Sequence, residues 1–212
     1  ELIAVEGDLD AARTALAALR DTDDPETVEQ AWLTEARVLR QAGERETAFD
    51  VLTTALVAQP ESIDLLYTRS LLAAELRRVD AAERDLRKIL ASQPENAAAL
   101  NALGYTLADQ TERYDEAEDY IRQASILLPD EASIIDSMGW IAYRQGRLDE
   151  AEEFLARAWS LDRNPEIAAH LGEVLWVKGQ RDKALEVLRQ GLELDAENPV
   201  LQETLDRLDV AP

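Results

Sequence analysis

Apolar residues along this chain fall on one side of short helical segments instead of alternating with polar residues. In the segment PVLQETLDRLDV, Val200, Leu201, Leu205 and Leu208 share one side of the predicted helix, and its other side is polar. No stretch alternates apolar and polar residues for long enough to predict a β-strand. Ala and Leu, which favour helices and close helix packing, dominate the apolar residues. The pattern therefore predicts an all-α protein.

A period of about 34 residues organises these segments, and a period of this size is typical of a stacked-repeat solenoid. Small residues mark the positions where helices must approach closely. On the first helix of a repeat these are Gly104, Gly139 and Gly172, and on the second helix they are Ala48, Ala82, Ala117, Ala151 and Ala184. We therefore predict repeated pairs of antiparallel helices.

The turns within these pairs are also visible in the sequence. Gly43, Gly146 and Gly179 stand where one helix ends and the next begins, and glycine tolerates the backbone conformation such a turn needs. The second repeat differs, because Arg77 replaces the turn glycine and Ser70 replaces the helix glycine.

The period divides the chain into successive units. Residues 1–22 are predicted to be the second helix of a truncated repeat, with Gly7 in its turn and Leu16 and Leu19 on its buried stripe. Asp24 is a predicted N-cap ahead of Pro25. The five complete repeats are predicted at 29–62, 63–96, 97–131, 132–164 and 165–198, followed by a capping helix at 199–210.

The repeated residues resemble the tetratricopeptide repeat. The first repeat carries this likeness in Trp32, Leu39, Ala48 and Pro60, and the third carries it in Leu103, Gly104, Ala117, Ala124 and Pro129. The resemblance implies a right-handed superhelical α-solenoid whose first helices line a concave groove. It also implies a scaffold that binds a protein or peptide ligand.

Placing the repeat on this sequence predicts the groove residues. They are Tyr67, Leu71, Asn101, Tyr105, Asp136, Trp140, Tyr143, Arg144, Glu173 and Trp176. Tyr and Trp are common anchors of binding surfaces, which favours a partner-binding groove. The alternative is that these aromatic residues pack on neighbouring first helices.

Composition narrows the classes of function. The chain has 44 Asp and Glu against 22 Lys and Arg, a net charge of −22, and this argues against binding to nucleic acid or directly to an anionic membrane. There is no cysteine, and no catalytic motif is present, so we expect no enzymatic activity and no cofactor.

Two further residues have simple interpretations. His170, the single histidine, is predicted to form a local surface pair with Glu166 and not a metal site, because further ligands are not evident. Trp159, on a second helix, is a candidate for an exposed contact patch.

The strings NALGYTLAD, IDSMGWIAYRQG and LGEVLWVKG are similar to a more specific family. They resemble the C-terminal array of outer-membrane lipoproteins that serve as adaptors of a periplasmic carboxy-terminal processing protease. The resemblance implies a location on the periplasmic side of the outer membrane, with the protease and its cell-wall hydrolase substrates as partners. Alternatives are a cytoplasmic peptide-binding chaperone or co-chaperone, and a structural assembly module that self-associates.

Overall fold

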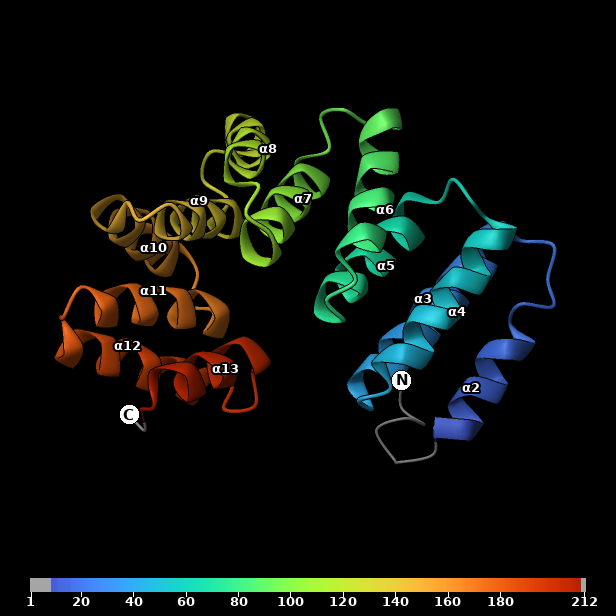
Figure 1. Cartoon of the computed structure of the whole chain (residues 1–212). Helices are drawn as coiled ribbons and strands as arrows, with labels where there is room; N and C mark the ends of the chain where they lie inside the picture. Colours follow the sequence, from blue (N-terminus) through green and yellow to red (C-terminus); the bar gives the residue numbers. More distant parts are fainter. Residues whose placement is uncertain (1–8, 211–212) are drawn as a thin grey trace. The chain divides into compact units, whose positions relative to one another are not determined.

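The computed structural model describes residues 9–210, which form twelve α-helices and no strand (Figure 1). This confirms the all-α prediction; Gly7 lies outside the described residues. The helices are α2 (Leu9–Ala18), α3 (Pro25–Gln41), α4 (Arg45–Ala58), α5 (Ile63–Glu75), α6 (Val79–Ser92), α7 (Ala97–Gln110), α8 (Tyr114–Leu127), α9 (Ala132–Arg144), α10 (Leu148–Leu161), α11 (Pro165–Val177), α12 (Arg181–Leu194) and α13 (Pro199–Leu208).

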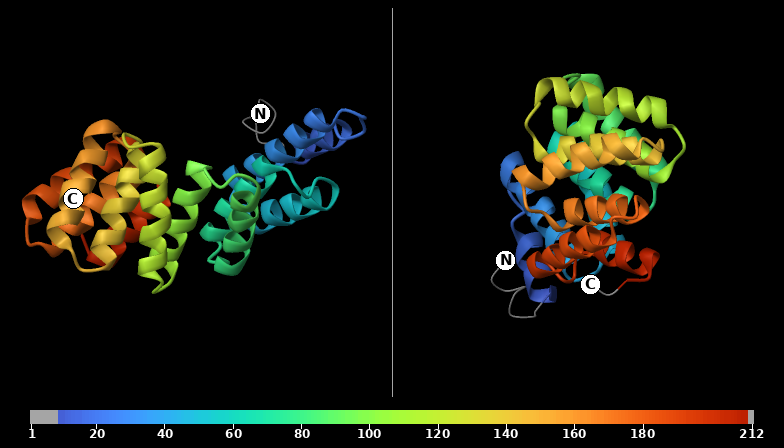
Figure 2. Two further views of the ribbon diagram at one scale, coloured as in Figure 1. Left: turned by 90° about the horizontal axis from the view of Figure 1, so that it is seen from above. Right: turned by 90° about the vertical axis from the view of Figure 1, so that its left-hand side faces the viewer.

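The chain divides into two compact units between Pro94 and Glu95. Unit 1 contains α2 to α6, and unit 2 contains α7 to α13. Within each unit consecutive helices pack as antiparallel pairs, of which α3 with α4 and α9 with α10 are examples (Figure 1). Figure 2 shows the helices from two further sides. Each unit is therefore a stack of helix hairpins.

Side-chain caps explain where several first helices begin. The Asp24 carboxylate accepts a hydrogen bond from the Thr27 amide at 3.3 Å, and Pro25 occupies the first turn, as the sequence predicts. Ser62, Asn96, Asn164 and Asn198 cap α5, α7, α11 and α13 in the same way. These caps satisfy backbone N–H groups that the helices leave unpaired.

Four of the first helices end at a residue in the left-handed backbone conformation. Gly43, Gly146 and Gly179 have φ of +82°, +79° and +79°, and Arg77 takes the same role at +56°. In each turn the next amide donates to a carbonyl five residues earlier, as Arg78 does to Ala73 at 2.8 Å. The helix α7 ends differently, because Thr111 is extended and its hydroxyl bonds the Leu107 carbonyl.

The helix glycines allow the two helices of a pair to touch. A Cβ atom at Gly104 would lie 2.5 Å from Ile121 Cγ1 and 2.8 Å from the Ala117 carbonyl oxygen. At Gly139 and Gly172 it would meet Leu155 and Leu188 at 2.5 Å. These first-helix residues are therefore glycine because the second helix occupies the space of a side chain.

One hydrophobic cluster of unit 2 gathers apolar residues from α9 to α12, and Trp159 belongs to it. Its side chain is buried, and the Arg163 guanidinium covers its ring at 4.4 Å. The prediction that Trp159 forms an exposed contact patch is therefore wrong. A second cluster joins Leu201 and Leu205 of α13 to Leu188 and Ala169, as expected of a helix that covers the end of a repeat.

The helix α2 ends earlier than the sequence predicts. The helix α2 ends at Ala18, so Leu19 lies beyond it and is 52% exposed. The prediction that Leu19 is buried is wrong because the segment leaves the helix before this residue.

Candidate functional site

Each first helix carries three positions, spaced four and three residues apart, that repeat with the period of the chain. We call these the groove positions. They are Leu33, Arg37 and Arg40 on α3; Tyr67, Leu71 and Ala74 on α5; Asn101, Tyr105 and Ala108 on α7; Asp136, Trp140 and Tyr143 on α9; and Ala169, Glu173 and Trp176 on α11. The spacing places them on one side of each helix.

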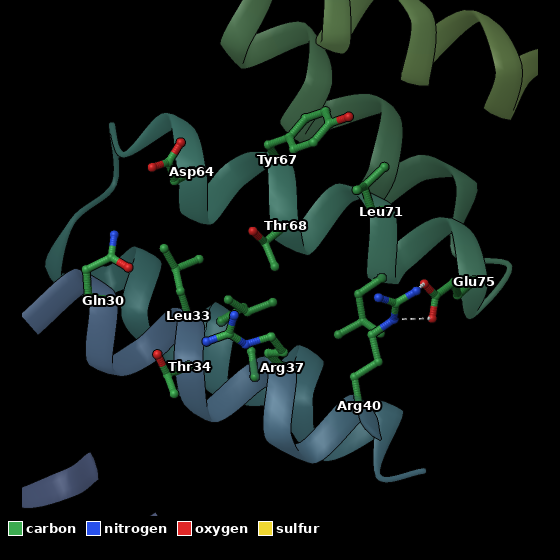
Figure 3. Close-up of a pocket in the computed structure, with 13 residues that line it drawn as sticks. Gln30, Leu33, Thr34, Arg37, Arg40, Asp64, Tyr67, Thr68, Leu71 and Glu75 are labelled. Carbon is green, nitrogen blue, oxygen red and sulfur yellow. Dashed lines mark hydrogen bonds and ion pairs between the residues drawn. The ribbon is translucent and has the colours of Figure 1, made fainter. Parts of the chain in front are cut away.

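In unit 1 the groove positions of α3 and α5, with the exception of Ala74, line a cavity of about 460 Å³, shown in Figure 3. We call it the α3–α5 groove. Its lining residues are Gln30, Leu33, Thr34, Ala36, Arg37, Arg40 and Leu52, together with Asp64, Tyr67, Thr68, Leu71, Leu72 and Glu75. Two of the predicted site residues, Tyr67 and Leu71, therefore lie in one groove.

The side chains of the α3–α5 groove offer both apolar and polar contacts. Leu71 is 41% exposed, so its side chain presents apolar surface in the wall of the groove. Tyr67 is half-buried, and this burial raises the pKa of its hydroxyl above the usual value. A surface of this kind suits a ligand that is partly apolar.

One end of the α3–α5 groove is closed by an ion pair between its two helices (Figure 3). Arg40 donates to Glu75 through Nε at 3.1 Å, and a second contact from Nη2 measures 2.5 Å. Arg45 also lies 3.4 Å from the Glu75 carboxylate. Two guanidinium groups therefore surround the one carboxylate at this end.

In unit 2 the predicted groove residues are buried or partly buried in the structure. Asp136, Trp140 and Glu173 are buried, while Asn101, Tyr105, Tyr143, Arg144 and Trp176 are partly buried. This is the arrangement in which the aromatic residues pack on neighbouring first helices. Their role in binding a partner stays a prediction.

His170 of α11 is the centre of one buried cluster. Its Nδ1 lies 2.9 Å and 3.0 Å from the two Asp136 carboxylate oxygens, and its Nε2 lies 3.2 Å from the Tyr105 hydroxyl. The Trp140 ring stacks on the imidazole with centroids 4.3 Å apart. The cluster therefore ties α7, α9 and α11 together.

The sequence prediction of a surface pair between His170 and Glu166 is wrong, because His170 is 2% exposed and pairs with Asp136 of the preceding repeat. Burial lowers the pKa of the imidazole, but the negative charge of Asp136 and its hydrogen bond outweigh this, so the pKa is raised overall. The apolar run around His170 is the one sequence signal that indicates its burial.

A second polar chain joins α9, α11 and α13. The Tyr143 hydroxyl donates to Glu173 at 2.9 Å, and Arg207 contacts the same carboxylate at 2.5 Å and 3.2 Å. Burial, and then the charge of Glu173, raise the pKa of Tyr143 to about 12. Glu173 is therefore neutralised inside the unit, which explains how a buried carboxylate is tolerated.

The remaining predicted residues also have internal roles. Arg144 donates to the Asp109 carbonyl at 2.6 Å and to the Tyr114 hydroxyl at 3.2 Å. The Arg181 guanidinium lies over the Trp176 ring at 4.4 Å. Asn101 Oδ1 and Trp140 Nε1 are buried and have no hydrogen-bond partner within residues 9–210.

No group of three metal-ligating side chains gathers anywhere in the described part of the chain. Within residues 9–210, none of the helices has the length and apolar character needed to cross a membrane.

Comparison with known proteins agrees with the repeat pattern and the helix hairpins. Two models of the tetratricopeptide repeat match residues 67–132 and 142–208. This chain belongs to the tetratricopeptide-repeat family. A solved tetratricopeptide-repeat protein of Thermus thermophilus has a TM-score of 0.75 at 23% identity, covering 86% of this chain and all of that one. The solved PilF of Pseudomonas aeruginosa has a TM-score of 0.63 at 24% identity, covering 87% of this chain and 84% of that one. At these identities both structures show the fold alone.

Two curated relatives of Pseudomonas aeruginosa are similar in sequence to this tetratricopeptide-repeat chain. A TPR repeat-containing protein is 46% identical over 167 residues, which is 79% of this chain and 28% of that protein. The type IV pilus assembly protein PilF is 29% identical over 139 residues, which is 64% of this chain and 55% of that protein. The chain therefore spans about a quarter and about half of the lengths of these relatives.

Proposed function

We propose that this chain is the partner-binding array of a non-enzymatic adaptor, and that it contacts its partner through the α3–α5 groove. The observation that carries the proposal is the accessible cavity between two first helices, with Leu71 exposed in its wall. Tetratricopeptide repeats bind protein or peptide partners, and an exposed apolar residue within a concave site is a typical anchor for such a partner.

The partner that we propose is a periplasmic carboxy-terminal processing protease, to which the array brings substrates such as cell-wall hydrolases. The support for this finer statement is the resemblance carried by NALGYTLAD, IDSMGWIAYRQG and LGEVLWVKG. All three strings lie in unit 2. On this proposal the chain works on the periplasmic side of the outer membrane.

The test is affinity capture from a periplasmic extract with the immobilised chain, followed by mass spectrometry. We expect recovery of a processing protease or a cell-wall hydrolase. The variant Leu71→Asp should reduce this recovery about tenfold or more, because a charge in an apolar contact removes roughly 1.5–3 kcal/mol of burial energy.

The matched control is Val57→Asp on α4. Val57 is also an exposed aliphatic residue of unit 1, at 83%, but it does not line the groove. Its substitution should leave capture unchanged. Equal capture by the two variants would show that the groove is not the contact surface, and recovery of neither class of enzyme would contradict the adaptor assignment.

A second candidate, a structural assembly module, is favoured by the sequence similarity to a pilus assembly protein. It predicts that the purified chain captures pilus components or copies of itself, in place of enzymes. Sedimentation velocity over a range of concentrations, together with the same mass-spectrometric experiment, distinguishes the two candidates.

A further inference from the structure

The second helices of unit 2 end in exposed apolar residues. Leu127, Leu161 and Leu194 are the last residues of α8, α10 and α12, and all three are exposed. Beside Leu127, Ile126 is 73% exposed and Leu128 is 48% exposed. We call these five residues the leucine edge.

The second helices of unit 1 end differently. The last residues of α4 and α6 are Ala58 and Ser92, and Val57 is the exposed aliphatic residue beside Ala58. A helix hairpin of this chain therefore does not require a leucine at this place. Single exposed leucines are common on proteins, whereas a larger apolar surface bordered by polar residues marks an interaction site.

A side-chain contact joins the end of α10 to the loop that follows α8. Arg157, which lies one turn before Leu161, donates to the Pro129 carbonyl at 3.2 Å and to the Asp130 carboxylate at 2.6 Å. Pro129 directly follows Leu128 in the chain. The first four residues of the leucine edge therefore come from two adjoining helix ends.

A second contact joins the end of α10 to the last turns of α12. Arg163, just beyond α10, donates to the Gln190 side-chain oxygen at 2.7 Å, and Gln190 lies one turn before Leu194. The end of α10 therefore adjoins the ends of both α8 and α12, so the five apolar residues belong to one edge of unit 2.

Acidic residues border the leucine edge. Within three residues of its members in sequence, Arg163 is the one basic residue, and the acidic residues are Asp130, Glu131, Asp162, Glu193, Asp195 and Glu197. The whole chain has 44 acidic and 22 basic residues, so this border is more acidic than the chain average. Asp130 pairs with Arg157, and the other carboxylates form no ion pair within residues 9–210. The border therefore carries negative charge that a cationic partner can neutralise.

We propose that the leucine edge of unit 2 binds a basic amphipathic helix of a partner protein. Such a helix presents an apolar stripe to the leucines and places Lys or Arg on both sides of that stripe, opposite the acidic border. A second copy of this chain would bring the same negative charges together, and an anionic membrane would be repelled by them. This surface is additional to the α3–α5 groove, so the inference goes beyond the proposed function.

The probe is a fluorescent peptide of leucine and lysine, about five helical turns long, whose leucines share one side when it is helical. The comparison peptide has the same composition in scrambled order, so it has the same charge but no apolar stripe. Binding to the full chain is followed by fluorescence anisotropy. We expect the amphipathic peptide to bind at least about tenfold more tightly than the scrambled peptide.

The decisive variant combines Ile126→Ser with Leu161→Ser, which removes apolar surface and leaves the net charge unchanged. It should bind the amphipathic peptide about tenfold or more weakly than the parent chain. The matched control combines Val57→Ser with Val177→Ser, two exposed aliphatic residues outside the leucine edge, and it should bind like the parent. Circular dichroism establishes that both variants keep their helices.

The acidic border is tested separately. Glu193→Gln combined with Asp195→Asn should weaken binding about threefold or more at low salt, and added salt should reduce this difference. The control combines Glu153→Gln with Asp182→Asn, which removes two exposed carboxylates of the same unit that lie away from the helix ends. It should leave the affinity closer to that of the parent chain.

Equal affinity of the apolar variant and its control would overturn the proposal, and so would equal binding of the scrambled peptide. Self-association that Ile126→Ser with Leu161→Ser abolishes, without peptide binding by the parent chain, would identify a second copy as the occupant and would also overturn it. Binding to vesicles of anionic phospholipid that the same variant abolishes would overturn it in favour of a membrane. Capture of the protease is not a readout in these experiments, so they fail independently of the proposed function.

Discussion

A turn that needs a left-handed residue is occupied by glycine in three repeats and by Arg77, at φ +56°, in another. A residue with a Cβ atom pays about 1–2 kcal/mol to adopt this conformation. Glycine avoids this cost but loses about 0.5–1 kcal/mol through the greater freedom of the unfolded chain. The two effects leave a net advantage for glycine.

We therefore expect Arg77→Gly to be more stable than Arg77→Ala by about 0.5–1 kcal/mol. The comparison is made with alanine because both variants remove the Arg77 side chain together with any contacts it makes. Urea unfolding followed by circular dichroism gives the two free energies. Equal stability of the two variants would mean that the left-handed conformation costs alanine no more than glycine loses through the freedom of the unfolded chain.

At the residue scale, the sequence predicts which positions share a face but not what occupies the space in front of them. The groove positions of Asp136 and Trp140 follow from the repeat. Their burial depends on His170, which comes from the next repeat, 34 residues after Asp136. His170 is the single histidine of the chain, so this histidine–carboxylate pair does not recur from repeat to repeat and the period does not indicate it. The prediction that His170 lies on the surface was wrong for this reason.

At the scale of the helix pair, the approach of α7 to α8 differs from that of α9 to α10. A Cβ atom at Gly104 would meet a backbone carbonyl, that of Ala117, at 2.8 Å as well as the Ile121 side chain. A Cβ atom at Gly139 would meet mainly the Leu155 side chain, with the nearest backbone atom at 3.2 Å. A side chain can change its rotamer, whereas a backbone carbonyl moves only with its helix.

We expect Gly104→Ala to destabilise the protein by about 1–3 kcal/mol and Gly139→Ala to cost less. The gain in helix propensity from glycine to alanine, up to about 1 kcal/mol, is the same for both and cancels in the comparison. Differential scanning calorimetry of the two variants gives the order. The reverse order would contradict the distances at the two crossings.

Helices and turns are the elements that the sequence predicts best. Asp24, Pro25 and the three turn glycines act locally, so their effects are readable from neighbouring residues. The end of α2 at Ala18 was missed, because nothing in the local pattern before Leu19 marks a stop. Local signals determine elements, and packing determines where a weakly marked element ends.

At the scale of the whole molecule, two units built from one repeat differ in what their groove positions do. In unit 1 the positions on α3 and α5, except Ala74, line a cavity, whereas in unit 2 several of the corresponding residues belong to two chains of polar contacts. The repeat pattern is the same in both units, so this difference was not predictable from the period. The cavity between first helices therefore belongs to unit 1, whereas the groove positions of unit 2 take part in internal contacts.

The contacts that join α7, α9 and α11 in unit 2 include a titratable group, the imidazole of His170. The groups around His170 are Asp136 of α9, Tyr105 of α7 and the charges of Glu166 and Glu173 on its own helix, and Arg207 of α13 pairs with Glu173. The net effect raises the pKa of His170 in the folded chain above its unfolded value of about 6.5. A raised pKa in the folded state means that folding favours the protonated imidazole.

The stability that this proton contributes is complete below the unfolded pKa and is lost as the pH rises through the folded pKa. We therefore expect the free energy of unfolding to fall between about pH 6.5 and the folded-state midpoint. Because the chain has one histidine, a single imidazole resonance in an NMR titration reports that midpoint directly. Asp136→Asn should lower the midpoint and flatten the pH dependence, while Asp149→Asn at the exposed partner of Lys178 should change neither. If Asp136→Asn kept the same midpoint, the ion pair would not be the source of the raised pKa, and His170 would join α9 to α11 through packing alone.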